Sequence, residues 1–210
     1  MIRWPLRGGA GAACAKAARF CTRHDLVGAE FLAGIPGTIG GALAMNAGAW
    51  GGETWPHVEA VETVDRAGVL RERPREDYRV GYRSVEGPAQ EWFVGARFVF
   101  EAGDGSAARE RIRSLLEQRG RTQPTGTRNC GSVFRNPPGD HAARLIEDAG
   151  LKGASVGGAA VSAKHANFIL NRGDATAANV EALIERIRAE VARRFGVELQ
   201  REVQIVGEAA

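Results

Sequence analysis

The chain reads GIPGTIGGALAMNAGA over residues 34–49, and this glycine-rich stretch says most about its fold. Glycine has no side chain, so a flat or anionic ligand can approach the backbone closely, and unhindered N–H groups can cradle a diphosphate. The stretch is not a phosphate-binding P-loop, because no Gly-Lys-Ser or Gly-Lys-Thr follows it. Tight turns in a packed loop explain the same glycines. Ligand contact and packing are therefore both open interpretations of the stretch taken alone.

The surroundings of the stretch argue against a membrane span. Residues 31–52 carry no charge, but Pro36 and the repeated glycines lower the helix propensity of this window. We therefore expect no membrane insertion. Upstream, Gly8-Gly9-Ala10-Gly11 has no expected strand before it, as a dinucleotide-binding fingerprint requires, so it carries less weight.

Composition indicates a folded protein and argues against some classes of function. The 210 residues, of which 44% are hydrophobic, suit one large or two small domains. The formal net charge is only +3, and the basic residues form no run with interleaved aromatics, so nucleic acid is not an expected partner. Three cysteines without a Cys-x-x-Cys pair favour a reducing, cytoplasmic setting and argue against zinc. We expect Cys21 and His24 to lie at the edge of a core and not to bind metal.

Hydrophobic periodicity predicts an α+β fold with a boundary near residue 105, so that 1–105 and 106–210 form two domains. An apolar stripe from Val180 to Val191 predicts a long helix that ends at Gly196. Asp140 is expected to cap a short helix. The other expected elements are helices over 10–24 and 106–119 and strands over 58–65, 92–100, 168–170 and 197–206.

Four polar positions have an ordinary structural interpretation. Arg83 lies in a polar stretch before a strand, where an arginine is usually a solvated surface charge. Ser132 follows a glycine, as turn serines do, and lacks the Gly-x-Ser-x-Gly pattern of a hydrolase nucleophile. The segment 162–168 either binds an anion or satisfies backbone groups, and both interpretations stay open. Glu202, on the polar face of the last expected strand, would most often be solvated.

Several motifs nevertheless follow one another in a set order along the chain. After the glycine-rich stretch they are Tyr82-Arg83-Ser84, Gln123-Pro124, Gly131-Ser132-Val133-Phe134-Arg135-Asn136-Pro137, Leu145-Ile146-Glu147, Gly150-Leu151-Lys152-Gly153, Ser162-x-Lys164-His165-x-Asn167-Phe168 and Glu202-Val203. This ordered series resembles the UDP-N-acetylenolpyruvoylglucosamine reductases, or UDP-N-acetylmuramate dehydrogenases, the FAD enzymes of bacterial peptidoglycan synthesis. The series is specific, whereas any one member would not be.

The resemblance implies an oxidoreductase that takes hydride from NADPH onto FAD and passes it to the enolpyruvyl double bond of UDP-N-acetylglucosamine enolpyruvate. It implies Ser132 as proton donor, with Arg83 and Glu202 as the other catalytic residues. Arg83 can stabilise the enolate-like charge, while Glu202 either polarises the carboxylate or relays a proton. The residues implied to lie against FAD are Ile35, Pro36, Gly37, Thr38, Gly40, Gly41, Asn46, Gly48 and Ala49. Those implied to bind the nucleotide sugar are Arg135, Asn136, Lys164 and His165.

The resemblance also implies part of a vanillyl-alcohol-oxidase-like FAD-binding domain followed by an α+β substrate-binding domain. By this resemblance we expect the chain to lack the family's N-terminal subdomain with the other Gly-rich flavin loop, and we identify no family motif in residues 1–7. The uninterrupted passage over 151–168 resembles the shorter family type without an inserted tyrosine loop, and Arg135 replaces the more usual lysine. With half of the flavin site missing, the alternatives are a flavin-free nucleotide-sugar-binding remnant and a non-functional gene fragment. The oligomeric state is not implied.

Overall fold

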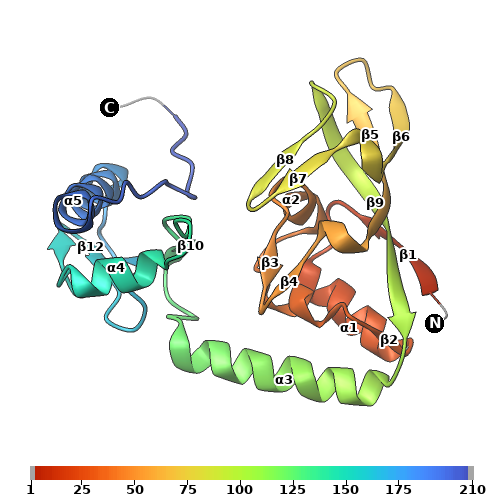
Figure 1. The fold of residues 1–210 in the computed structure, drawn as a ribbon, viewed down its shortest axis with the longest axis horizontal. Helices are drawn as coiled ribbons and strands as arrows, with labels where there is room; N and C mark the ends of the chain where they lie inside the picture. Colours follow the sequence, from red (N-terminus) through yellow and green to blue (C-terminus); the bar gives the residue numbers. More distant parts are fainter. Residues whose placement is uncertain (1–2, 208–210) are drawn as a thin grey trace. The chain divides into compact units, whose positions relative to one another are not determined.

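The computed structural model describes residues 3–207 and divides into two compact units, the first ending at Gln118 and the second beginning at Arg119 (Figure 1). Met1 and Ile2 lie outside the described residues. The expected boundary near residue 105 coincides with the first residue of helix α3 (Gly105–Thr122), which continues past the division. Helices and strands mix in both units, so the expected α+β class is confirmed.

The first unit is built on an antiparallel sheet of order β1-β9-β5-β6, with β2 pairing to β9. Helix α2 packs against β9 and β1, and α1 packs against the 3₁₀ turn η1. The sheet strands are β1 (Arg3–Gly9), β2 (Leu26–Val27), β5 (Val58–Asp65), β6 (Leu70–Pro74) and β9 (Glu91–Ala102). The helices and 3₁₀ turns are α1 (Cys14–Arg23), η1 (Glu30–Gly34), α2 (Ile39–Ala44), η2 (Trp55–His57) and η3 (Arg75–Asp77). Two small hairpins complete it: β3 (Gly48–Ala49) with β4 (Gly52–Glu53), and β7 (Arg79–Gly81) with β8 (Ser84–Glu86).

The core of the first unit follows the periodicity of its elements. Phe98 and Phe100 alternate on β9 and are buried, as a strand with one covered face requires. Cys14 and Cys21 lie one above the other on α1 and are fully buried, which raises their pKa values to about 11 and about 12. Cys21 and His24 were both expected at the edge of a core: Cys21 is fully buried in it, whereas His24 is exposed and its ring is tilted by 37° to that of Phe20.

The absence of a strand before Gly8 was a wrong expectation. β1 pairs with β9 from Arg3 to Gly9 and leads directly into the glycine segment. β1 is an edge strand, a place where Pro5 is tolerated because only one side of the strand must supply ladder hydrogen bonds. The sequence pattern did not indicate this strand, because it contains a proline and only Trp4 and Leu6 alternate around that proline.

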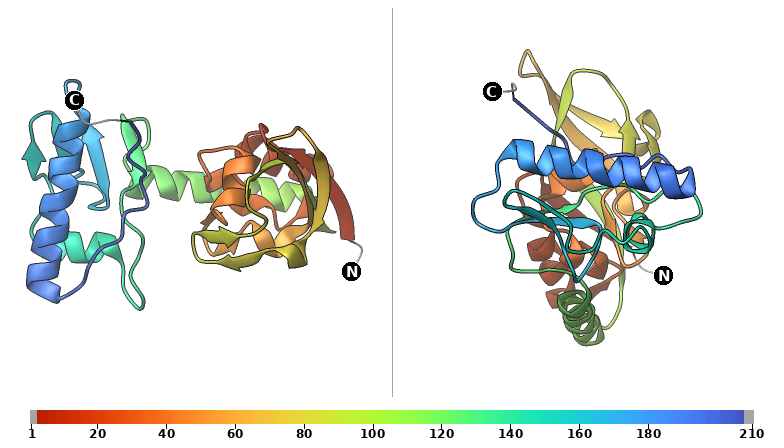
Figure 2. Two further views of the ribbon diagram at one scale, coloured as in Figure 1. Left: turned by 90° about the horizontal axis from the view of Figure 1, so that it is seen from above. Right: turned by 90° about the vertical axis from the view of Figure 1, so that its left-hand side faces the viewer.

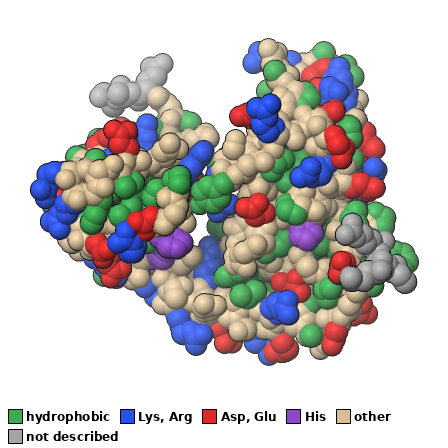
Figure 3. All heavy atoms as spheres, in the orientation of Figure 1, with side chains coloured by type: hydrophobic (Ala, Val, Ile, Leu, Met, Phe, Trp, Pro, Cys, Tyr) green, Lys and Arg blue, Asp and Glu red, His purple; other side chains and the backbone are tan. Residues whose placement is uncertain are grey.

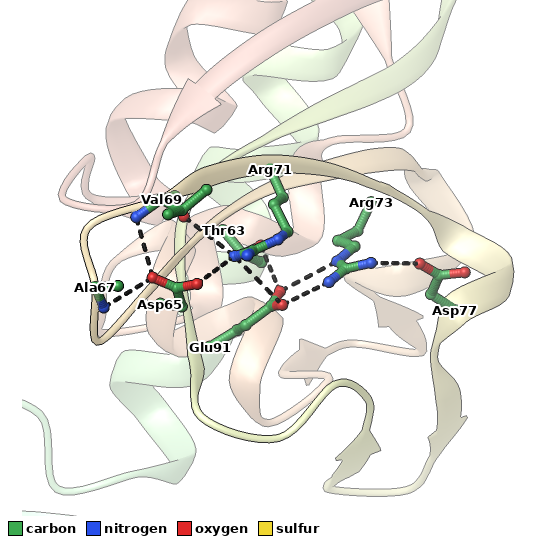
Figure 4. A network of polar contacts seen from close by, with 8 residues as sticks. All are labelled: Thr63, Asp65, Ala67, Val69, Arg71, Arg73, Asp77 and Glu91. Atoms are coloured by element: carbon green, nitrogen blue, oxygen red, sulfur yellow. Dashed lines mark hydrogen bonds and ion pairs between the residues drawn. The ribbon is translucent and has the colours of Figure 1, made fainter.

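Paired charges cover much of the first unit's sheet. Arg7 contacts Glu62 at 2.7 Å, and Arg97 contacts Glu59 at 2.7 Å. Figure 4 shows a denser network at the β5–β6 hairpin, where Arg73 Nη2 lies 2.6 Å from Glu91 Oε1. The hydrogen bond from Arg73 holds the pKa of Glu91 below its usual range. On the face shown in Figure 3, Lys and Arg side chains are interspersed with Asp and Glu, so no single-sign field covers it.

The second unit has a smaller antiparallel sheet, of order β10-β13-β12-β11, and two helices. Helix α5 packs against β11, β12 and α4, as the views of Figure 2 show. It begins with a capping box of Thr176 and Asn179 and ends at Gly196, whose φ of 68° confirms the expected stop. Its buried residues are Leu183, Ile184, Ile187 and Val191, which confirms the apolar stripe. The elements are β10 (Asn129–Ser132), α4 (Ala142–Asp148), β11 (Ser155–Val156), β12 (Ala159–Val161), β13 (Phe168–Asn171) and α5 (Ala177–Phe195).

Two sequence expectations for the second unit were wrong. Residues 197–206 form no strand: they make one isolated bridge, between Arg201 and Phe134, because their backbone meets only the short segment after β10. Asp140 does not cap α4; its carboxylate accepts from His141 N, while Asn136 Oδ1 accepts from Ala142 N at 3.1 Å. A cap supplied from six residues upstream carries no local sequence signature.

Within residues 3–207 we find no helix with the length and apolarity to cross a membrane. The same residues hold no group of three His, Cys, Asp or Glu side chains placed to bind a metal ion.

Candidate functional site

The two glycine segments of the first unit lie side by side. Gly40 N donates to Ala10 O and Ile39 N donates to Ala12 O, each at 2.9 Å. Thr38 caps α2 by accepting from Gly41 N at 3.4 Å. The early segment Gly8-Gly9-Ala10-Gly11, which carried less weight in the sequence analysis, therefore lies directly beside the glycine-rich stretch.

The glycines of the stretch divide into two kinds. A methyl group on Gly40 would lie 3.0 Å from Ala10 Cβ, and one on Gly48 would lie 2.4 Å from Gly52 O. These two glycines permit backbone packing. A methyl group on Gly37 would meet nothing within 4 Å, and one on Gly41 would meet only Thr38 Oγ1 at 3.9 Å. The exposed backbone at Gly37 and Gly41 is therefore open to a ligand.

Burial also separates the other residues expected to lie against FAD. Pro36 and Thr38 are exposed, beside the open glycines. Ile35 is buried in the core, and Asn46 is buried with 2% exposure. Ala49 is half-buried, in the small β3–β4 hairpin. Ile35 and Asn46 are thus enclosed by protein, unlike the exposed residues 36–38.

Arg83 is held against the end of the glycine-rich stretch. It lies in the two-residue turn between β7 and β8 and has a φ of 52°, in the left-handed region. Its Nη1 donates to Asn46 O at 3.5 Å and its Nη2 donates to Gly48 O at 3.4 Å. Its Cζ lies 5.4 Å from the centre of the Tyr82 ring. Arg83 is half-buried, so the interpretation as a freely solvated surface charge does not describe it.

Ser132 and Glu202 come from neighbouring backbone segments of the second unit. Ser132 is the last residue of β10, and the carbonyl of Val133 accepts from Glu202 N at 2.8 Å. The same two segments are joined again where Arg135 N donates to Gln200 O at 2.9 Å. Ser132 and Glu202 are both half-buried. Main-chain pairing thus places a hydroxyl and a carboxylate on adjacent segments.

The Ser162–Phe168 motif largely satisfies backbone groups, one of its two open interpretations. Ser162 Oγ accepts from Lys164 N at 3.1 Å and from His165 N at 3.2 Å. Asn167 brackets Phe134: its Oδ1 accepts from Phe134 N at 3.0 Å, and its Nδ2 donates to Phe134 O at 2.8 Å. This bracket fixes the segment that follows Ser132.

The four residues expected at the nucleotide sugar have different surroundings. Lys164 is exposed, and its Nζ donates to Gly120 O. His165 is half-buried, which lowers its pKa, and its Nδ1 accepts from Asn167 N at 3.3 Å. Asn136 caps α4. Arg135 is half-buried, and its Nε is buried without a hydrogen bond, so this cation retains donor capacity.

Known proteins resemble the chain along nearly all of its length. Residues 3–72 match the FAD binding domain family, and residues 123–206 match the family described as UDP-N-acetylenolpyruvoylglucosamine reductase, C-terminal domain. A UDP-N-acetylenolpyruvoylglucosamine reductase of Alkalilimnicola ehrlichii is 66% identical over 95% of this chain and 67% of its own length. One of Methylococcus capsulatus is 64% identical over 95% of this chain and 66% of its own length.

A solved structure gives the same result. The crystal structure of UDP-N-acetylenolpyruvylglucosamine reductase (MurB) from Thermus caldophilus matches with a TM-score of 0.84 and 34% identity, over 95% of this chain and 71% of that one. This chain belongs to the UDP-N-acetylenolpyruvoylglucosamine reductase family. The expected resemblance, with an FAD-binding domain followed by the reductase C-terminal domain, is confirmed. The chain spans about two thirds of the length of the relatives it matches.

The residues present fit the FAD that this reductase family uses. A methyl group on Gly37 or Gly41 would obstruct a ligand that approaches this open backbone, but it would not clash with the protein itself. Sequence reasoning named Asn167 only within a motif and did not single out Glu53, whose carboxylate accepts from Asn46 Nδ2 at 2.9 Å. Asn167 belongs to a quoted motif but has partners 33 residues away, and Glu53 has no local signal.

Proposed function

We propose that this protein is an oxidoreductase that reduces UDP-N-acetylglucosamine enolpyruvate to UDP-N-acetylmuramate, with FAD as bound cofactor and NADPH as reductant. The observation that carries the proposal is the 66% identity, over 95% of the chain, to a protein named UDP-N-acetylenolpyruvoylglucosamine reductase. The match of residues 3–72 to an FAD binding domain supports the cofactor. The reaction belongs to peptidoglycan precursor synthesis, and a cytoplasmic location stays a prediction.

Gly37 and Gly41, with the exposed Pro36 and Thr38 beside them, are the residues that would hold FAD. Their backbone is accessible and carries no side chain, so a flat cofactor can approach it closely, although the Gly37 N–H donates to Ile35 O and the Gly41 N–H to Thr38 Oγ1. When bound, the cofactor supplies hydride transfer from NADPH to the enolpyruvyl double bond. Gly40 and Gly48 contribute by packing, and not by contact through an open face.

Arg83 stabilises the negative charge that develops on the enolpyruvyl carboxylate. Addition of hydride at C3 leaves electron density on C2 and the carboxylate, and a fixed guanidinium stabilises this density without reorganising at the moment of reaction. Its long hydrogen bonds to Asn46 O and Gly48 O hold the guanidinium in a fixed orientation.

Ser132 donates the proton to C2. A serine hydroxyl is a weak acid in water, so it has to be held close to a strongly basic carbon. Its position at the end of β10, where Asn167 fixes the next residues, supports such placement. Glu202, on the paired segment, either polarises the substrate carboxylate or helps return a proton to Ser132.

Arg135 and Lys164 are the stronger candidates for the diphosphate of the nucleotide sugar. Arg135 retains a buried guanidinium nitrogen without a hydrogen bond, and the Lys164 ammonium has donors beyond its one contact to Gly120 O. Asn136 and His165 are also proposed to line this site, although each already makes a hydrogen bond within the protein.

The test is a coupled absorbance and mass measurement on the FAD-loaded protein. We expect NADPH oxidation to require the enolpyruvyl uridine sugar, and the product to be heavier than the substrate by two hydrogens. Oxidation of NADPH at the same rate without the sugar would contradict the assignment. Tight binding of the sugar by protein that never takes up FAD would instead support the flavin-free binding remnant.

A further inference from the structure

We propose that Glu53 is a positioning residue for Arg83 and acts through the side-chain amide of Asn46. The proposal rests on the catalytic role of Arg83 in the proposed function. It also gives Asn46 a role different from that of a flavin contact, because the amide of Asn46 is buried and makes three hydrogen bonds inside the protein.

The amide of Asn46 has three partners that fix its orientation. Nδ2 donates to Glu53 Oε2 at 2.9 Å and to Gly81 O at 3.2 Å. Oδ1 accepts from Trp55 N at 3.1 Å. A carboxylate and a carbonyl can only accept, and a peptide N–H can only donate, so the opposite amide orientation would lose all three bonds.

Asn46 supports Arg83 through two contacts, one made by its side chain and one by its main chain. Gly81 pairs with Ser84 across the turn that contains Arg83, so the bond to Gly81 O holds one end of that turn. The main-chain carbonyl of the same asparagine accepts from Arg83 Nη1 at 3.5 Å. One buried residue thus holds both the backbone beneath Arg83 and part of its guanidinium.

Glu53 fixes this arrangement from the β3–β4 hairpin. It pairs with Gly48, whose carbonyl accepts from Arg83 Nη2 at 3.4 Å. A half-buried carboxylate is the strongest acceptor that the amide meets, and charge-assisted bonds exceed neutral ones in strength. Without Glu53, only Gly81 O and Trp55 N oppose rotation of the Asn46 amide, so its bond to Gly81 O holds the Arg83 turn less firmly.

The first test needs no cofactor: amide hydrogen exchange of residues 79–86, compared among Glu53→Ala, Glu53→Gln and the parent protein. We expect exchange at least about tenfold faster in Glu53→Ala and near the parent rate in Glu53→Gln, because a glutamine carbonyl still accepts from Asn46. The matched control is Glu62→Ala, which removes a carboxylate that pairs with Arg7 in the same unit. Unchanged exchange in Glu53→Ala would overturn the proposal.

The second test measures the two half-reactions of the FAD-loaded protein by stopped-flow absorbance. We expect Glu53→Ala to slow flavin reoxidation by the enolpyruvyl sugar about 10- to 100-fold, to leave reduction by NADPH near normal, and to be rescued in Glu53→Gln. A purely structural defect would slow both half-reactions and overturn the positioning role.

Arg83→Ala separates this inference from the proposed function. If Arg83→Ala leaves reoxidation unchanged, the proposed role of Arg83 fails, while the exchange test still decides whether Glu53 holds the turn. If Arg83→Ala slows reoxidation and Glu53→Ala does not, the proposed function stands and the positioning role of Glu53 is overturned.

Discussion

The two units hold their candidate catalytic residues in different ways. In the first unit, Arg83 lies in a turn and depends on long-range contacts of side chains with main-chain carbonyls at residues 46, 48 and 81. In the second unit, Ser132 and Glu202 lie on segments joined by main-chain hydrogen bonds. A side-chain change near Arg83 should therefore move a catalytic group, whereas removal of the Ser132 side chain should leave its segment in place.

The largest effect that this comparison predicts is on catalysis in the second unit. Ser132→Ala should slow flavin reoxidation by the enolpyruvyl sugar at least about a thousandfold, about 4 kcal/mol, and leave reduction by NADPH near normal. Ser132→Cys should partly rescue it, since a thiol still donates a proton. Stopped-flow absorbance of each half-reaction is the measurement, with exposed Ser155→Ala as control. Reoxidation at the parent rate would make Glu202 or a bound water the better candidate for the acid.

The next largest effect tests whether main-chain pairing in the second unit depends on the buried hydrogen bonds between Asn167 and Phe134. Asn167→Ala should lower the free energy of unfolding by about 2 to 3 kcal/mol, because it leaves the N–H and the carbonyl of Phe134 without their partner in a buried site. Urea unfolding measures the change, and exposed Gln204→Ala serves as control. A loss below about 0.5 kcal/mol would show that the backbone pairs alone suffice.

A smaller effect separates the two kinds of glycine in the first unit. Gly40→Ala should be less stable than Gly41→Ala by about 1 kcal/mol, because only the methyl group at 40 meets the Ala10 backbone segment. Both residues lie in α2, so the gain in helix propensity cancels between the two variants. Gly41→Ala should fold normally yet bind FAD more weakly. Thermal unfolding and FAD titration decide this, and equal FAD affinity in Gly41→Ala and the parent would assign Gly41 to packing.

The smallest effect is a pH dependence confined to the second unit. Burial lowers the pKa of His165 in the folded state, so protonation favours the unfolded chain. The stability that this residue contributes is complete above its unfolded pKa and declines as pH falls below it, through the mildly acidic range. Urea unfolding between pH 7.5 and 5.5 should show a loss of stability that His165→Asn reduces. The exposed His141→Asn should keep the parent's dependence, and an identical slope in all three proteins would contradict the prediction.

Local sequence patterns predicted the parts of the fold that depend on local physics. The α5 stripe and its Gly196 stop follow from helical spacing and a left-handed glycine, and both are found. The strand over residues 197–206 was wrong because alternation cannot say whether a partner strand of equal length exists. The motif order identified Arg83 and Ser132 as candidates, but no local pattern encodes the contacts that support them: Asn167 bonds Phe134 across 33 residues, and Asn46, which Glu53 holds, bonds Gly81 across 35.

Because the backbone at Arg83 is left-handed, the residue that makes the fold most stable at this position differs from the residue that supports catalysis. A non-glycine residue there costs about 1 to 2 kcal/mol, and the guanidinium's hydrogen bonds to Asn46 O and Gly48 O are long ones, at 3.5 and 3.4 Å. Arg83→Gly releases that cost and Arg83→Ala does not, although both lack the cation. A library of variants selected only for thermal resistance would therefore enrich glycine at position 83, and selection for cell-wall synthesis in the same library would remove it.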